Sequence, residues 1–457
     1  MRHSERLSLC SVSTQNALPV CSQQLHCLSV RVMVGAELAT LGVLDTSRNY
    51  LGMTQSLKPA SVSSHAPKIR ESLDPGAQSL VDKCLDAALK YRASDVHIEP
   101  QGEMLVFRFR IDGRLKTWGS VSIDQHSQVL NRLKVLARMD IAEKRMPQDG
   151  RISLQRGAQV MSFRVSTVPM LDGEKAVVRV MQQDLSALSL ADVGYSAHNQ
   201  AAYEALLGRQ QGLILHCGPT GSGKTTALYA ACNQLAQKWR NVQTIEDPVE
   251  GRLTGINQAQ VDADVGLSFA SLLRAYLRQD CDVILIGEIC DPDTAQLAVQ
   301  ASLTGHLVLA TLHTHDAAGA SSRLIDMGVP RNLVSAGLIG AVSQRLVRKL
   351  CEQCRVTTQP GPELQKRLGL SQQYALYQKL GCAACANAGF RGRVGIHEVL
   401  SIDGELKQAI IDSRPDGDLR RMAESKGMTN MVKDGIAKAV RGLTTVDEVY
   451  RSVSGAL

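Results

Sequence analysis

The sequence predicts an α/β fold with a parallel sheet in its carboxy-terminal half, preceded by a smaller α+β domain. Four short apolar runs, separated by stretches of helical periodicity, predict the parallel sheet: GLILHC, NVQTIED, DVILIGE and LVLATL. Upstream of them, apolar residues alternate with polar ones in pairs of runs joined by glycine-containing turns, which is typical of antiparallel hairpins. The two patterns therefore predict two domains of different class.

The composition is that of a globular protein. The 457 residues are 44% hydrophobic and 21% charged, enough for two or three domains. The net charge of +7 is small for this length and does not predict a dedicated nucleic-acid-binding protein. No run reaches the roughly 18 to 20 apolar residues of a membrane span. The twelve cysteines are mostly scattered, which favours a reducing cytoplasm over a disulfide-rich secreted fold.

Changes in composition predict the domain boundaries. Residues 1–75 are rich in Ser, Pro and Ala in their later part and show little periodicity, so we expect an irregular arm and linker there. The α+β domain is predicted at 76–186, a second linker at 187–204 and the α/β domain at 205–457. The last of these includes a cysteine-bearing segment at 345–395.

The amino-terminal domain is predicted from one helix and two hairpins. One face of the helix is apolar and carries Leu80, Cys84, Leu85, Ala88 and Leu89. In the first hairpin, apolar residues alternate with arginines before a tight turn at Asp112 and Gly113. The second hairpin is expected to turn at Arg156 and Gly157.

The segment HCGPTGSGKTTALYA contains a complete phosphate-loop motif, directly after an apolar run and directly before a helical stretch. Its glycines let backbone N–H groups face phosphate oxygens. Lys224 would neutralise the β and γ phosphates, and the Thr225 hydroxyl would bind Mg²⁺. The predicted nucleotide-binding residues are Gly218, Pro219, Thr220, Gly221, Ser222, Gly223, Lys224, Thr225 and Thr226.

Two other predicted strands end in acidic residues. Glu288 ends the run DVILIGE, where its carboxylate is expected beside the phosphate loop as the second Mg²⁺-associated group. A buried structural carboxylate is the alternative. The run TIEDPVE carries Glu246, Asp247 and Glu250, which either orient and deprotonate the attacking water or form a solvated turn.

Histidines and arginines extend the candidate site. His306 and His313 flank the fourth predicted strand, and we expect them to sense the γ-phosphate or to lie at a subunit interface; His315 is given no such role. Arg274 and Arg278 are four residues apart on one face of a predicted helix. They are either solvated surface residues or compensate the charge of a nucleotide bound at a subunit boundary.

Two Cys-x-x-Cys pairs, 27 residues apart, predict a metal site. Four thiolates close a tetrahedral site without an open position, which favours a structural Zn²⁺. A redox-active pair is the alternative. The predicted ligands are Cys351, Cys354, Cys382 and Cys385.

In this order, the motifs resemble the hexameric ATPases of type II secretion and type IV pilus assembly. The likeness covers roughly residues 76–457 and rests on RASDVHIEP, RIDGRL, RMPQDGRISL, FRVSTVP, GPTGSGKTT, TIEDPVE, LLRAYLRQD, VILIGEI, TGHLVLATLHTHD, QRLVRKLCEQC and GRVGIHEVL. It implies a RecA-like P-loop ATPase core, a preceding PAS-like domain and a four-cysteine zinc segment. The zinc segment favours an assembly or secretion motor over a pilus-retraction motor.

The resemblance also implies roles for individual residues. Glu250 would be the general base, Glu288 the Mg²⁺-associated acid, and His306 and His313 the histidine-box residues. Four arginines would contact nucleotide across or near subunit boundaries: Arg151, Arg164, Arg274 and Arg278.

The function implied is that of a cytoplasmic Mg²⁺-dependent ATPase that forms a homohexamer. Such a motor would act on an inner-membrane platform protein and on pilin or pseudopilin subunits, and would lie at the membrane only through these partners. A nucleic-acid motor shares the core, but the small charge and the 4% aromatic content disfavour direct nucleic-acid binding.

Two positions depart from the family pattern. Cys281 stands where the family usually has proline, and Cys290 stands where it usually has arginine, two residues after Glu288. The second change removes a positive charge near the predicted acid. It motivates an alternative function, a nucleotide-binding scaffold subunit with impaired hydrolysis.

Overall fold

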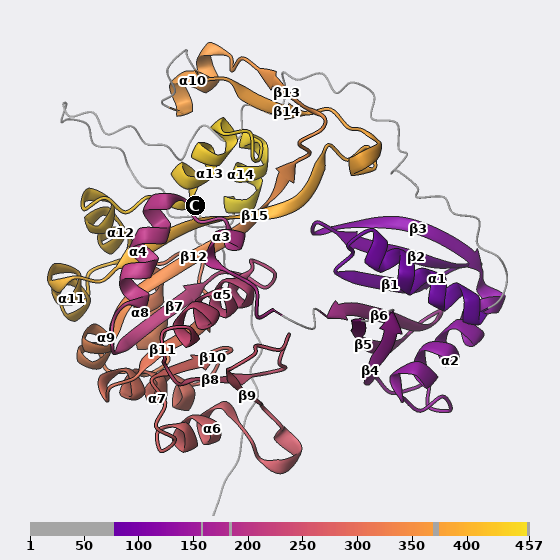
Figure 1. Cartoon of the computed structure of the whole chain (residues 1–457), viewed down its shortest axis with the longest axis horizontal. Helices are drawn as coiled ribbons and strands as arrows, with labels where there is room; N and C mark the ends of the chain where they lie inside the picture. The colour runs from indigo at the N-terminus through magenta and orange to yellow at the C-terminus, as the bar shows by residue number, and fades with distance from the viewer. Residues whose placement is uncertain (1–76, 157–158, 182–184, 369–373, 455–457) are drawn as a thin grey trace, which may run out of the picture. The chain divides into compact units, whose positions relative to one another are not determined.

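The computed structural model describes residues 77–454, apart from 157–158, 182–184 and 369–373. The predicted arm at residues 1–75 and the turn residue Gly157 lie outside this part of the chain. The amino-terminal and carboxy-terminal domains are described separately below (Figure 1).

The amino-terminal domain consists of a six-stranded antiparallel sheet and two helices, with strand order β3-β2-β1-β6-β5-β4. Its elements are α1 (Ala77–Lys90), β1 (Asp95–Gln101), β2 (Met104–Ile111), β3 (Arg114–Ser122), α2 (His126–Ala137), β4 (Gln148–Arg156), β5 (Gln159–Met170) and β6 (Gly173–Met181). Side chains from both helices and from one face of the sheet form a single hydrophobic cluster around Phe107, Phe109 and Trp118.

The predicted helix and both hairpins of this domain are confirmed. The turn after β2 has positive φ at Asp112 (50°) and Gly113 (81°), as a two-residue hairpin turn of type I′ requires. Strands β1 and β6 and helix α2 were not predicted. In β1, buried Val96 and Ile98 alternate with charged residues over only seven positions, which is a weak signal in sequence alone.

The carboxy-terminal domain contains a seven-stranded sheet in the order β15-β12-β7-β11-β10-β8-β9. Every neighbouring pair is parallel except β12 and β15. The sheet strands are β7 (Gly212–Cys217), β8 (Val242–Glu246), β9 (Asn257–Gln260), β10 (Val283–Ile286), β11 (Leu307–Leu312), β12 (Leu338–Leu350) and β15 (Phe390–Ser401). The four predicted strands are thus confirmed as parallel neighbours.

Helices connect these strands, and a small two-stranded sheet lies between β12 and β15 in the chain. The helices are α3 (Leu190–Val193), α4 (Ala197–Leu207), α5 (Lys224–Ala236), α6 (Phe269–Tyr276), α7 (Pro292–Leu303), α8 (Gly319–Asp326), α9 (Arg331–Gly337), α10 (Pro362–Leu368), α11 (Gly404–Ile411), α12 (Asp416–Ser425), α13 (Met431–Val440) and α14 (Val446–Val453). The small sheet pairs β13 (Arg355–Thr358) with β14 (Leu376–Lys379).

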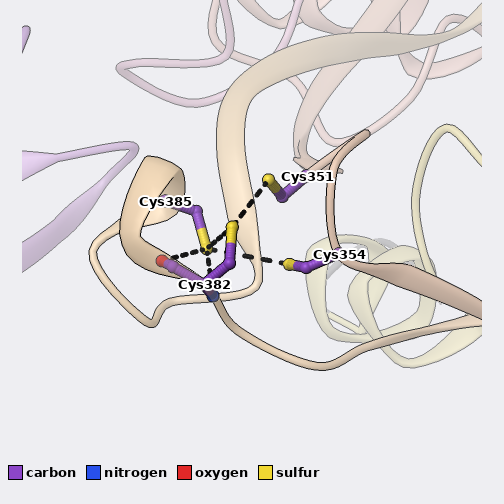
Figure 2. A group of neighbouring side chains, drawn as sticks. All are labelled: Cys351, Cys354, Cys382 and Cys385. Carbon is purple, nitrogen blue, oxygen red and sulfur yellow. Dashed lines mark hydrogen bonds between the residues drawn. The ribbon is translucent and has the colours of Figure 1, made fainter.

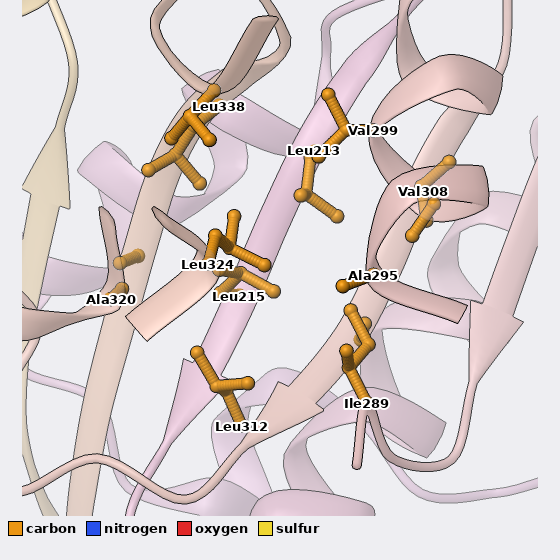
Figure 3. Close-up of a cluster of buried hydrophobic side chains, with 14 of the residues drawn as sticks. Leu213, Leu215, Ile289, Ala295, Val299, Val308, Leu312, Ala320, Leu324 and Leu338 are labelled. Carbon is orange, nitrogen blue, oxygen red and sulfur yellow. The ribbon is translucent and has the colours of Figure 1, made fainter. Parts of the chain in front are cut away.

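The parallel sheet is buried on both faces. Every residue of β7 and of β11 is buried, as expected when helices cover both sides. On one face, Leu213 and Leu215 of β7 pack with apolar residues of α7 and α8 (Figure 3). On the other face, Ile214 packs with apolar residues of α4 and α5. This double cover holds the strand ends rigidly at each edge of the sheet.

The segment predicted as a second linker, 187–204, is not an open connection in the structure. It forms α3 and most of α4, and its residues Leu190, Val193 and Tyr203 are buried in the core of the carboxy-terminal domain. Strands β12 and β15 were also not predicted. Among the described residues, no helix has both the length and the apolar character that crossing a bilayer requires.

A buried ion pair stabilises the amino-terminal domain. The Lys134 ammonium group on α2 is fully buried, lies 2.6 Å from the Glu174 carboxylate and donates a hydrogen bond to the Glu143 carbonyl oxygen. We expect Lys134→Ala to lower the free energy of unfolding by about 3 to 5 kcal/mol, because it leaves a buried carboxylate unpaired.

Denaturant unfolding followed by the fluorescence of buried Trp118 measures this effect, in a Trp239→Phe background that removes the only other tryptophan. Lys83→Ala, on the exposed side of α1, is the matched control and should change the stability by less than about 0.5 kcal/mol. Equal effects of the two substitutions would contradict the importance of the pair.

Candidate nucleotide site and cysteine cluster

The phosphate loop joins β7 to α5 and depends on glycine at two crowded positions. Gly218 has φ of 145°, and a Cβ atom there would lie 2.8 Å from the carbonyl oxygen of Gln344. Gly223 has φ of 90°, and a Cβ atom would lie 2.6 Å from the Gln344 side-chain nitrogen. The neighbouring strand β12 therefore packs directly against the loop, and only glycine, which has no Cβ atom, fits at these two positions.

Donors of the loop are free to receive phosphate. Among the described residues, the backbone N–H groups of Thr220, Gly221 and Gly223 have no hydrogen-bond acceptor. The Lys224 Nζ atom donates to the carbonyl oxygens of Gly218 (2.7 Å) and Pro219 (3.2 Å). Desolvation lowers the pKa of Lys224, and the nearby negative charge of Glu288 opposes that shift. The arrangement suits an anion that would replace the two carbonyl groups as the partner of Lys224.

Glu288 and His313 lie at the same edge of the sheet as the phosphate loop. Each follows a parallel strand, β10 and β11 respectively, and the ends of parallel strands meet at one edge. The Glu288 carboxylate is 3.6 Å from His313 Nε2, and both side chains are about half exposed. The turn carrying Glu288 is held in place because Thr311 Oγ1 donates to the Gly287 carbonyl oxygen at 2.6 Å.

The acidic run after β8 separates into two environments. Glu246 is buried and accepts hydrogen bonds from Tyr229, Thr244 and Gln258, so its carboxylate is a structural anchor. Glu250 is only partly buried, and its backbone N–H donates to the Tyr229 hydroxyl at 3.3 Å. Tyr229 therefore links the phosphate-loop helix α5 to both parts of the acidic run.

The structure separates the two histidines that were predicted to act together. His306 precedes β11 and His313 follows it, and the strand has six residues. At about 3.3 Å per residue, the two histidines lie roughly 20 Å apart, at opposite edges of the sheet. His306 Nδ1 lies 3.2 Å from the Ala301 carbonyl oxygen. His306 therefore does not lie beside the phosphate loop of its own chain; its role as a γ-phosphate sensor or at a subunit interface remains a prediction.

Arg274 and Arg278 do not share a helix face. Helix α6 ends at Tyr276, and the Arg278 guanidinium donates to the Arg274 carbonyl oxygen at 2.8 Å. Both side chains are exposed or partly exposed, and the nearest acidic partner of Arg274 is Asp293 at 4.0 Å. Neither has a described contact with the phosphate loop of its own chain.

Arg151 and Arg164 belong to a charged row on the outer face of the amino-terminal sheet. From β2 to β4, this row contains Arg110, Asp95, Arg179, Arg164 and Arg151. Asp95 lies 2.9 Å from Arg179 and 3.6 Å from Arg110, so one carboxylate serves two guanidinium groups. Arg164 and Arg151 extend the row with positive charge. Periodicity of single strands does not show this row, because it depends on register across the sheet.

The two departures from the family pattern lie in different surroundings. Cys281 is buried, and its thiol donates to the Tyr276 carbonyl oxygen at 3.3 Å. Cys290 is exposed and follows Glu288 by two residues. Partial desolvation, together with the charges of Glu288 and Asp291, raises the pKa of the Cys290 thiol. Neither a thiol nor a thiolate carries a positive charge, so Cys290 does not replace the missing guanidinium.

The two Cys-x-x-Cys pairs converge where β12 and β14 end. Cys351 and Cys354 lie between β12 and β13, whereas Cys382 and Cys385 lie between β14 and β15 (Figure 2). All four sulfur atoms are within 4.8 Å of one another. Three of the separations are 3.7 to 3.8 Å. A tetrahedron with Zn–S bonds of about 2.3 Å has sulfur atoms about 3.8 Å apart, so the cluster fits Zn²⁺.

Backbone N–H groups favour the thiolate form of Cys385, whereas desolvation raises the pKa of the Cys354 thiol to about 11. Desolvation opposes ionisation of Cys385, but N–H donation from Cys382 and Gly389 outweighs it and lowers the pKa of that thiol to about 7. Gly381 N–H donates to the Cys354 sulfur at 3.3 Å. Such N–H···S bonds are typical partners of metal-bound thiolates.

Comparisons with known proteins agree with this geometry. The family model described as "Type II/IV secretion system protein" matches residues 71–451. The chain belongs to this family. Type II secretion system protein E of Dickeya dadantii is 46% identical over 372 residues, which are 81% of this chain and 74% of that protein. The type IV pilus assembly ATPase PilB of Thermus thermophilus is 42% identical over 387 residues, 84% of this chain but 44% of that protein.

Solved structures give the same result for the fold. The pilus retraction motor PilT, solved with bound ADP, is 25% identical, has a TM-score of 0.57 and covers 81% of this chain and 95% of its own. The ATPase DotB of Legionella pneumophila, at 20% identity and a TM-score of 0.64, covers 85% of this chain and 99% of its own and supports the fold. The RecA-like core is therefore confirmed, and the chain is an ATP hydrolase of the secretion and pilus-assembly family.

Sequence reasoning missed two residues at this site, Gln344 and Arg345 of β12. Both are buried and both contact the phosphate-loop region. The only signal was their presence in the run QRLVRKLCEQC, which was used for the resemblance and not for the site.

Buried histidines behind the phosphate loop make stability sensitive to acid. His216 of β7 is hydrogen-bonded to the Tyr203 hydroxyl at 2.7 Å. Burial, and then the charge of Lys224, lower the pKa of His216 to about 3. Burial also lowers the pKa of His397 well below its usual range. Between about pH 6.5 and 3 the unfolded chain binds protons at these sites and the folded chain does not, so stability falls as pH falls.

Each such histidine contributes a slope of up to about 1.4 kcal/mol per pH unit. We expect His216→Gln, which keeps a polar partner for Tyr203, to lower the pH dependence of the free energy of unfolding between pH 6.5 and 5. Denaturant unfolding at several pH values measures the slope. His198→Gln, an exposed histidine, is the control and should leave the slope unchanged; an unchanged slope in His216→Gln would contradict a buried neutral imidazole.

Metal content tests the cysteine cluster. We expect about one Zn²⁺ per chain in the purified protein and almost none in Cys382→Ser, because three thiolates leave the tetrahedral site open. Atomic emission spectroscopy gives the stoichiometry, and limited proteolysis should show faster cleavage between β12 and β15 in the variant. Cys290→Ser removes an exposed thiol outside the cluster and should retain the metal. Equal metal content in both variants would exclude the site.

Proposed function

We propose that this chain is a Mg²⁺-dependent motor ATPase that forms a homohexamer and drives type IV pilus assembly or type II secretion. Its partners would be an inner-membrane platform protein and pilin or pseudopilin subunits, so it would lie in the cytoplasm at the membrane. One observation carries the hydrolytic part of the proposal: the phosphate loop, Glu288 and His313 meet at one edge of the parallel sheet.

In this proposal the residues Gly218 to Thr226 bind the triphosphate, with Lys224 as the cation on its β and γ groups. Glu250 accepts the proton of the attacking water, since Glu246 is buried and already accepts hydrogen bonds from three side chains. His313 lies beside Glu288 and contacts the γ-phosphate. The free N–H groups of the loop stabilise charge on the phosphate oxygens without rearranging solvent.

Mg²⁺ would be held by Thr225 and Glu288. Thr225 is exposed in the first turn of α5, and the half-exposed Glu288 carboxylate has only His313 as a described ion-pair partner. Oxygen ligands of this kind suit Mg²⁺, which keeps several waters and binds through few protein groups. When bound, the ion would neutralise charge on the phosphates.

The arginines support the assembly part of the proposal. Arg151, Arg164, Arg274 and Arg278 have side chains exposed or partly exposed to solvent, and none is held by a close buried carboxylate. Such cations are available to a nucleotide bound by a neighbouring copy, and this role is worth about 10³- to 10⁵-fold in rate where arginine fingers have been measured. Hydrolysis would then change the angle between the two domains and move the platform protein.

Phosphate release from Mg²⁺-ATP tests the proposal. We expect Lys224→Ala to lower kcat on the order of 100-fold or more, because it removes the main cation from the transferred phosphate. Lys238→Ala, in the turn that follows α5, is the control and should be active.

Equal release by wild type and Lys224→Ala would favour the alternative function, a nucleotide-binding scaffold. The exposed thiol of Cys290 in place of an arginine is the observation behind that alternative. We expect no direct action on nucleic acid, and stimulation of the ATPase by DNA would contradict this.

A further inference from the structure

Strand β12 pairs with β7 from Leu338 to Ser343 and continues past the phosphate loop. The register of the parallel pair places Ser343 next to Cys217, the last residue of β7. Gln344 and Arg345 consequently lie next to the first residues of the loop. A Cβ atom on Gly218 would be 2.8 Å from the Gln344 carbonyl oxygen and 3.1 Å from Arg345 Nη1.

The Gln344 side chain holds the loop at Ser222. It is 1% exposed, and its Nε2 atom donates to the Ser222 carbonyl oxygen at 2.9 Å. Two buried polar atoms at this contact have no partner in the described part of the chain: Gln344 Oε1 and Ser222 Oγ. Leaving a buried polar atom without a hydrogen bond costs free energy. This conformation of the loop therefore has two hydrogen bonds still to gain. A small shift of the loop on nucleotide binding would give them the opportunity to pair.

Arg345 continues the contact to the segment that follows β11. The residue is 6% exposed, and its guanidinium donates to the Gln344 carbonyl oxygen through Nη1 (3.0 Å) and to the His315 carbonyl oxygen through Nη2 (2.8 Å). Within the described chain it has no carboxylate at ion-pair distance. Its two hydrogen bonds to main-chain carbonyl groups are therefore its principal interactions, and the fork geometry of arginine suits two acceptors at once.

The bonds form a continuous path. It runs from the Ser222 carbonyl through Gln344 and Arg345 to the His315 carbonyl. His315 is two residues from His313, which faces Glu288 at 3.6 Å. A displacement of the phosphate loop would reach the segment that carries His313 through these bonds. The path lies within one chain and needs no neighbouring copy.

We propose that Gln344 and Arg345 are positioning residues, which couple the occupancy of the phosphate loop to the placement of His313. This inference rests on the proposed hydrolysis of ATP. Neither side chain is proposed to contact the nucleotide. Their loss should lower kcat and leave nucleotide affinity nearly unchanged, because the loop itself still forms.

The first test uses Gln344→Met in the full-length chain. Methionine has nearly the volume of glutamine but lacks the donor to Ser222. We expect kcat for ATP to fall at least about 10-fold, with KM and the affinity for ADP changed less than about 3-fold. Thermal unfolding without nucleotide is measured beside it. Lys349→Gln is the matched control on the same strand and should behave as the wild type in all three measurements.

The second test does not depend on activity. Hydrogen exchange with and without ADP is followed at residues 218–226 and 313–317, in wild type and in Arg345→Lys, which keeps the charge and loses the fork. We expect ADP to protect both segments in wild type. In the variant, protection of 218–226 should remain and protection of 313–317 should be lost.

The outcomes separate this inference from the proposed function. If the wild type releases no more phosphate from Mg²⁺-ATP than Lys224→Ala does, the proposed function is overturned. Active wild type with Gln344→Met unchanged in kcat overturns the coupling, as does unchanged protection of 313–317 in Arg345→Lys. A fall in thermal stability with normal kcat in the folded fraction identifies Gln344 as a purely structural residue and also overturns it.

Discussion

The candidate site depends on the parallel register of β7, β11 and β10. Because all three strands run in the same direction, the phosphate loop, the His313 segment and the Glu288 turn emerge at the same edge of the sheet. The sheet is buried on both faces, so these ends cannot move independently without disturbing two hydrophobic clusters. The parallel direction of the strands therefore brings a cation, a carboxylate and an imidazole to one edge of the sheet.

Strand β12, which pairs with β7 on one side and β15 on the other, adds a second constraint to this arrangement. It is long, it lies against β7, and it brings a buried amide and a buried guanidinium to the back of the phosphate loop. Glycine at positions 218 and 223 is required by this contact as much as by the phosphate. The loop is thus confined from two sides, by the nucleotide that it is proposed to bind and by β12.

The cysteine cluster and the amino-terminal sheet are stabilised in different ways. The cysteine cluster joins the ends of β12, β13, β14 and β15, where few large apolar side chains are buried. In the amino-terminal domain, the inner face of the sheet is aromatic and aliphatic and the outer face carries the arginine row. The inner face of this sheet therefore contributes to the stability of the domain, and the outer face carries the arginines that are proposed to act in assembly.

Sequence alone determined the features that depend on neighbouring residues. The phosphate loop, the four buried strands and the two cysteine pairs each have a local signature, since the required spacing is set by one turn, one strand or one chelating knuckle. The same local reasoning placed Glu288 and His313 correctly at strand ends, and both lie at the phosphate-loop edge.

Only the tertiary structure decided the features that depend on direction, register and long-range packing. His306 and His313 look equivalent in sequence because both flank one strand, but the direction of β11 places them at opposite edges of the sheet. The segment 187–204 looks like a linker, yet its apolar residues pack with α5 and with Val342 of β12 and Val399 of β15, which lie far along the chain. Gln344 lies beside the phosphate loop because β12 pairs with β7, and its partner Ser222 is 122 residues away in sequence. No local pattern specifies such a contact.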